Sequence, residues 1–82
     1  FNVMKIIEKE KILEKYFVDR EGKVILKTLR SKNLVKDGIL DSLNILTLAL
    51  FIEKKFNYKI DISKPKILKN FEKFDKIIKL LN

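Results

Sequence analysis

The stretch "DSLNILTLALFIEKKF", residues 41–56, predicts one long amphipathic helix. With about 100° between successive residues, its apolar side chains gather on one face. That face holds Ile45, Ala49, Ile52 and Phe56, flanked by Leu43, Leu46, Leu48 and Leu50. An apolar helix face has to be buried against other elements, so this stretch predicts a packed helical domain.

The opposite face of this helix is polar. It is formed by Asn44, Thr47, Lys54 and Lys55. Phe51 falls in the middle of that polar face, either as an exposed docking residue or as an extra core contact. Asn57 follows the last apolar position and is a residue type that tolerates the left-handed backbone conformation ending many helices.

Asp41 and Ser42 mark the start of the helix. An aspartate N-cap accepts hydrogen bonds from the free backbone N–H groups of the first turn. Ser42 is then the first helical residue, with its hydroxyl outside the bundle. A helix N-terminus carries roughly half a positive charge, so a phosphate ester on this serine would be stabilised. On its own, however, the dipeptide favours an ordinary helix start.

Further helices are predicted on the N-terminal side. Residues 4–17 mix good helix formers with apolar residues at near-helical spacing: Ile6, Ile7, Ile12, Leu13, Tyr16 and Phe17. Two turn signals, Glu21-Gly22 and Asp37-Gly38, bound the next connection. Between them lie too many apolar residues for a solvated loop: Val24, Ile25, Leu26, Leu29, Leu34 and Val35. We therefore expect this connection to cross the core, with a short helix at 24–31.

The C-terminal part predicts an extended piece and two more helices. Residues 58–63 are expected to be extended. Ser63 as a cap and Pro65 in the first turn predict a short helix at 64–69. With Asn70 as cap, a closing amphipathic helix buries Phe71, Phe74, Ile77, Ile78 and Leu81. The predicted fold class is all-α, a small four-helix bundle of three main helices and one short helix, forming a single domain over residues 1–82.

Composition excludes most enzyme chemistries. The 82 residues include no cysteine and no histidine, which excludes disulfides, thiolate zinc sites, cysteine nucleophiles and histidine acid–base catalysis. We predict no catalytic residue and no metal site. Without an apolar run of about 18 residues or a signal segment, the expectation is a soluble cytoplasmic protein with no stable membrane insertion. Residues 1–3 precede the only methionine, Met4, and are a candidate cloning remnant.

The formal charge of +8 favours anionic partners on electrostatic grounds. Only Arg20 and Arg30 could offer a bidentate fork to phosphate or guanine. The lysines of residues 5–15 alternate with glutamates, which is typical of a solvated face. A basic helical module that binds nucleic acid or an anionic membrane is therefore the alternative reading, and it predicts steeply salt-dependent binding.

The stretch "GILDSL", residues 38–43, resembles the acyl carrier protein family, whose D-S-L motif carries a 4′-phosphopantetheine group on the serine. In that family the following helix ends in a short acidic cluster and a phenylalanine, then a glycine and an extended piece. Here "EKKF" holds that position, Asn57 replaces the glycine and "YKIDI" follows. The order of helices also matches from about residue 34 to the end. Because Gly38 lies three residues before Asp41, the spacing looks more like D-alanyl and stand-alone aminoacyl carriers than fatty-acid carriers.

The resemblance implies a monomeric carrier that is not an enzyme and binds no nucleic acid. A phosphopantetheinyl transferase would attach 4′-phosphopantetheine from coenzyme A to Ser42. The thiol of the group would hold an acyl or aminoacyl cargo as a thioester, between a loading ligase and a downstream transferase or synthase of lipid, fatty acid, nonribosomal peptide or polyketide biosynthesis. Asp41 would help the transferase place Ser42, and Leu43 and Ile45 would frame the attachment point. A third reading is a carrier-like scaffold that is never modified.

The charge of the helix after Ser42 departs from the family. Family members carry carboxylates there, whereas this chain retains only Glu53. A partner that relies on salt bridges to carboxylates should bind this helix poorly. The resemblance therefore implies docking through apolar anchors, Leu43, Leu50 and Phe51. The predicted partner-binding surface comprises Asn44, Thr47, Leu50, Phe51 and Lys54. An acyl chain is expected to be sheltered between the second and third helices.

Overall fold

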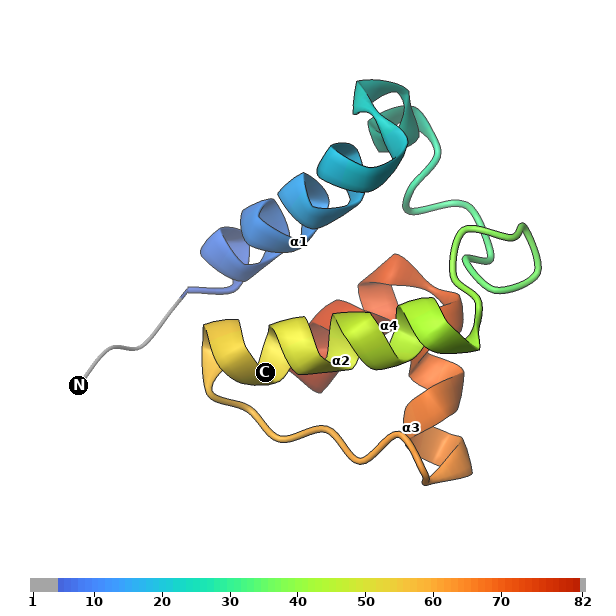
Figure 1. Cartoon of the computed structure of the whole chain (residues 1–82). Helices are drawn as coiled ribbons and strands as arrows, with labels where there is room; N and C mark the ends of the chain where they lie inside the picture. The colour runs from blue at the N-terminus through green and yellow to red at the C-terminus, as the bar shows by residue number, and fades with distance from the viewer. Residues whose placement is uncertain (1–4, 82) are drawn as a thin grey trace.

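The computed structural model describes residues 5–81. The candidate cloning remnant and the predicted helix start at Met4 lie outside this range. Within it the elements are α1 (Ile6–Glu21), the 3₁₀-helix η1 (Lys23–Lys27), α2 (Ser42–Phe56), α3 (Pro65–Lys69), the 3₁₀-helix η2 (Asn70–Glu72) and α4 (Phe74–Leu80) (Figure 1). Residues 5–81 contain no β-strand. The all-α prediction and the order of the helices are confirmed.

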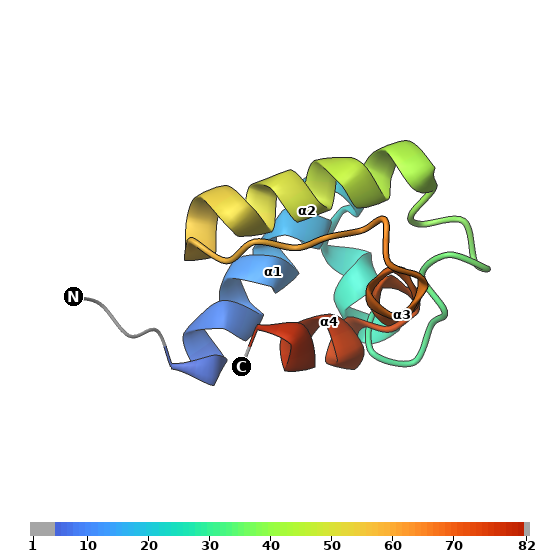
Figure 2. The same cartoon turned by 90° about the horizontal axis from the view of Figure 1, so that it is seen from below.

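The helices surround one core. In Figure 2, α2 and α4 lie on opposite sides of the molecule, and in Figure 1 α1 lies above α2 and is inclined to it. In both views the connection before α2, the N-terminal end of α2 and α3 lie at the same end of the molecule. A radius of gyration of 12.0 Å agrees with the value of about 12 Å for a folded chain of this length.

The core draws on residues from both halves of the chain. Its fully buried members include Leu13 and Phe17 of α1, Leu48 and Ile52 of α2, and Phe71, Phe74 and Ile77 near the C-terminus. Phe17 and Phe74 meet edge-on, with ring centroids 6.0 Å apart. The predicted buried face of α2 is confirmed for Ile45, Ala49 and Ile52, whereas Phe56 is only half-buried. The residues of α3 all stay at least partly exposed.

Helix α1 is longer than predicted and buries less of its N-terminal end. It continues four residues past the expected end, to Gly22, whose φ of 88° stops it and whose N–H still donates to the Val18 carbonyl. Ile6 and Ile7, predicted to face the core, are exposed. Both residues lie in the first turn of α1, where apolar spacing alone could not show that no other part of residues 5–81 covers them.

The connection between α1 and α2 crosses the core as predicted, but only half of its apolar residues are buried. Ile25, Leu29 and Leu34 are buried, whereas Val24, Leu26 and Val35 are exposed. The short helix is a 3₁₀-helix over Lys23–Lys27 rather than a helix over 24–31. The Leu34 N–H donates to the Glu72 carbonyl at 2.7 Å, which ties this connection to η2.

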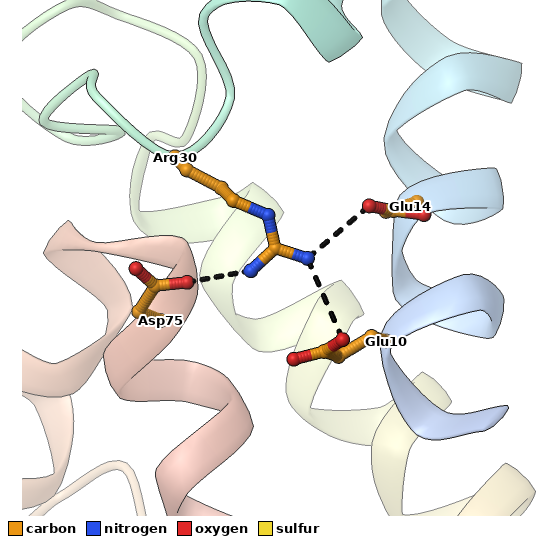
Figure 3. Close-up of polar contacts among 4 residues, drawn as sticks. All are labelled: Glu10, Glu14, Arg30 and Asp75. Carbon is orange, nitrogen blue, oxygen red and sulfur yellow. Dashed lines mark hydrogen bonds and ion pairs between the residues drawn. The ribbon is translucent and has the colours of Figure 1, made fainter. Parts of the chain in front are cut away.

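Arg30 joins the connection to two helices (Figure 3). Its guanidinium lies 2.7 Å from Asp75, 3.2 Å from Glu14 and 3.7 Å from Glu10. It also lies 4.7 Å from the centre of the Phe74 ring. Partial burial lowers the pKa of Arg30, but hydrogen bonds and charge from its three carboxylate partners outweigh that effect, so the net pKa is raised. The sequence suggested that Arg30 could bind phosphate or guanine. In the structure its guanidinium is instead paired with carboxylates of the protein itself.

Two predicted caps are wrong. The Ser63 hydroxyl and N–H both donate to Asp61, and the N-cap of α3 is Lys64, with Pro65 in the first turn. These hydrogen bonds lower the pKa of Asp61. Asn70 opens η2, while α4 starts later, at Phe74, with Lys73 as its N-cap. In the first case a nearby carboxylate is the stronger acceptor and competes for the serine.

Candidate functional site

The backbone that leads into α2 is held by local hydrogen bonds. The Leu34 carbonyl accepts from the N–H groups of Ile39 at 2.9 Å and Leu40 at 2.8 Å. Gly38 turns the chain with a φ of 79°, a conformation that side chains rarely adopt. The Leu40 side chain is buried immediately before Asp41. The hydrogen-bonded turn around Gly38 and the buried Leu40 side chain therefore hold the backbone at the start of α2 in place.

Asp41 caps α2, as predicted. Its backbone is extended, and its carboxylate accepts from the Asn44 N–H at 2.8 Å. The Asn44 side chain returns the contact, accepting from the Asp41 N–H at 3.2 Å. This reciprocal pair is a capping box with asparagine at the third helical position, where glutamate or glutamine is usual. The Asn44 side chain, predicted to meet a partner, is half-buried and engaged in the cap.

Ser42 is the first residue of α2 and is exposed. Within residues 5–81 its hydroxyl has no hydrogen-bond partner, and neither have the backbone N–H groups of Ser42 and Leu43. An exposed hydroxyl thus lies beside two free N–H donors at the positive end of the helix dipole.

A strip of exposed leucines runs along α2 from the serine. Leu43 is 69% exposed, Leu46 44% and Leu50 55%, and we call these three residues the leucine strip. Thr47 lies beside it and donates its hydroxyl to the Leu43 carbonyl at 2.9 Å. The sequence identified Leu43 and Leu50 but missed Leu46. The spacing of i, i+3 and i+7 was the available signal.

The other predicted site residues are spread between surface and core. Lys54 is exposed beyond the leucine strip. Ile45, predicted to frame the attachment point, is buried below Ser42, and only Leu43 is exposed beside it. Phe51 is half-buried, with its ring centroid 4.7 Å from that of Tyr16 in α1. That contact supports the reading of Phe51 as an extra packing residue.

The capping box makes a direct prediction. Asp41→Ala is expected to lower the free energy of unfolding by about 1 kcal/mol, because the Asn44 N–H loses its acceptor. Asp41→Asn, which keeps an acceptor of similar shape, should stay within a few tenths of a kcal/mol of the parent. Urea denaturation followed by circular dichroism measures both. Equal losses in the two variants would show that the charge, rather than the cap, is what stabilises the helix.

Comparison with protein-family models, with curated proteins and with solved structures finds no match for this chain. Among residues 5–81, no helix combines the length and apolar character needed to cross a bilayer. The same residues bring together no group of three or more side chains suited to hold a metal ion. The chemistry available at the site is therefore that of one exposed hydroxyl, its free backbone donors and the apolar strip beside it.

Proposed function

We propose that this chain is a carrier protein that holds an acyl or aminoacyl cargo on 4′-phosphopantetheine attached to Ser42. The observation that carries the proposal is the placement of Ser42. It is the serine of the D-S-L motif and the exposed first residue of a 15-residue helix, with a free hydroxyl. A serine that only capped the helix would be engaged with the backbone, and here Asp41 performs that role.

The residues around Ser42 suit the linking phosphate of such a group. The free N–H groups of Ser42 and Leu43 can donate to phosphate oxygens, and the helix dipole favours the negative charge there. The exposed hydroxyl is accessible to a transferase without displacing a buried side chain. When bound, the group supplies a thiol that holds the cargo as a thioester, which this cysteine-free chain cannot provide itself.

The leucine strip supports docking of partner enzymes at α2. Three exposed leucines follow the attachment point along one line, with few charges among them. Apolar anchors of this kind carry binding energy at the centre of interfaces. We expect the phosphopantetheinyl transferase, the loading ligase and the downstream transferase or synthase to contact this strip, with Thr47 and Lys54 at its border. In this proposal the chain is a monomeric substrate of these enzymes, with no catalytic residue of its own.

The basic-module reading has less support. It needs arginines that are free to contact phosphate, and one of the two candidates, Arg30, is held by three carboxylates. That leaves Arg20 as the one remaining arginine candidate, and the rest of the positive charge is carried by scattered lysines.

Intact-protein mass spectrometry tests the proposal. The parent is incubated with coenzyme A and a broad-specificity phosphopantetheinyl transferase, beside Ser42→Ala and the matched control Ser63→Ala. We expect the parent and the control to gain one phosphopantetheine and Ser42→Ala to gain none. Modification of Ser42→Ala would place the attachment elsewhere. A folded parent that several transferases leave unmodified would contradict the carrier proposal, and salt-dependent binding to DNA and anionic vesicles would then test the alternative.

A further inference from the structure

A second feature of the molecule, remote from Ser42, has the properties of a small-molecule site. A groove of about 370 Å³ lies between α1 and α2, and we call it the α1–α2 groove. This volume is at the lower end of the range of about 300–1,000 Å³ that is typical of ligand pockets. Its apolar surface comes from Ile12, Tyr16 and Phe51, with the two rings in direct contact.

The border of the α1–α2 groove is positively charged. Lys15, Arg20 and Lys55 line it, against a single carboxylate, Asp19. Asp19 lies 3.0 Å from Lys15 and is paired with it. Neither Arg20 nor Lys55 forms an ion pair with another residue of the range 5–81. Two uncompensated cations therefore lie beside an apolar surface.

Tyr16 adds a third observation. Its hydroxyl is buried and has no hydrogen-bond partner among the described residues. Buried polar groups are nearly always paired, and an unpaired one lowers stability. The guanidinium of Arg20 lies 5.7 Å from the centre of the same ring. Tyr16 thus has a buried hydroxyl without an acceptor, and its ring lies next to Arg20, which forms no ion pair within residues 5–81.

We infer that the α1–α2 groove binds a small amphiphilic carboxylate. Its aliphatic body would cover Tyr16 and Phe51, and its carboxylate would lie between Arg20 and Lys55. At about 30 Å³ for each small group, the volume suits a ligand of about ten to twelve non-hydrogen atoms. A monocarboxylic cargo tethered as a thioester has no free carboxylate, so binding of a free carboxylate at this site is distinct from the proposed carrier function and does not depend on it.

Three small-molecule probes test separately the contributions of the ligand's charge and of its alkyl chain. Octanoate has both the carboxylate and the apolar body, octylamine has the same body with the opposite charge, and acetate has the carboxylate alone. In titrations of the unmodified full chain followed by ¹H–¹⁵N NMR, we expect octanoate to shift the amides of Tyr16, Arg20, Phe51 and Lys55. Octylamine and acetate should bind at least tenfold more weakly. No saturable shift with octanoate, or equal binding of octylamine, would overturn the inference.

Variants then locate the site. Arg20→Gln/Lys55→Gln should weaken octanoate binding five- to twentyfold. The control Lys66→Gln/Lys69→Gln on α3 removes the same amount of charge elsewhere. Its affinity for octanoate should stay within twofold of the parent's. Tyr16→Phe removes the buried, unpaired hydroxyl, so it should raise the thermal midpoint and leave octanoate binding within twofold. Equal weakening by the two double variants would show a diffuse charge effect in place of a site. Circular dichroism confirms that each variant is folded.

Discussion

Phe17→Ala is expected to lower the free energy of unfolding by about 3–5 kcal/mol, the range typical of large buried aromatic side chains. Phe17 is fully buried and contacts Tyr16 and Phe74 edge-on. It links α1 to α4, so its removal leaves a cavity between these two helices. A chain of 82 residues has a total stability of about 4–12 kcal/mol, so this variant loses a large share of it and would be unfolded at 37 °C if the parent lies at the lower end of that range.

Urea denaturation of the parent and the variant, followed by circular dichroism, measures this loss. The control is Leu43→Ala, which removes a comparable apolar group from a residue that is 69% exposed. It should change stability by no more than about 0.5 kcal/mol. A loss below 1 kcal/mol for Phe17→Ala would contradict the packing of α1 against α4.

Arg30→Met is expected to lower the free energy of unfolding by about 1–2 kcal/mol at low salt. The Arg30 side chain is 43% exposed, so each ion pair is screened and contributes at most about 1 kcal/mol. The substitution also leaves three carboxylates without their shared cation and removes the cation–π contact with Phe74. The loss in stability should be smaller in 1 M salt, because the Debye screening length falls to about 3 Å.

Two further variants separate the geometry of Arg30 from its charge. Arg30→Lys restores the charge but not the two-sided fork, so it should recover only part of the loss. Lys15→Gln breaks an exposed pair within one helix, with Asp19, and should cost no more than about 0.5 kcal/mol. If Arg30→Met matched the parent at low salt, the network of Figure 3 would be of no consequence for stability.

The sequence alone determined the helix that carries the candidate site. The structure starts α2 at Ser42 and ends it at Phe56, as predicted, and the cap at Asp41 and the left-handed Asn57 are both confirmed. These features depend on contacts within about four residues: helical periodicity, a capping box and a terminating backbone conformation. Local chemistry of this kind can be recognised in a chain before its partners are known.

Which residues are covered and which charges are paired depends on how the helices pack against one another. Phe51 lies on the polar face of its own helix and is half-buried because α1 brings Tyr16 against it. Ile6 and Ile7 have core-like spacing, yet both are exposed, and no helix within residues 5–81 covers them. Arg30 donates a hydrogen bond to the carboxylate of Asp75, which is 45 residues away in sequence. Burial and ion pairing involve residues of different helices. They therefore depend on how the helices cross, and a local sequence pattern carries no information about that.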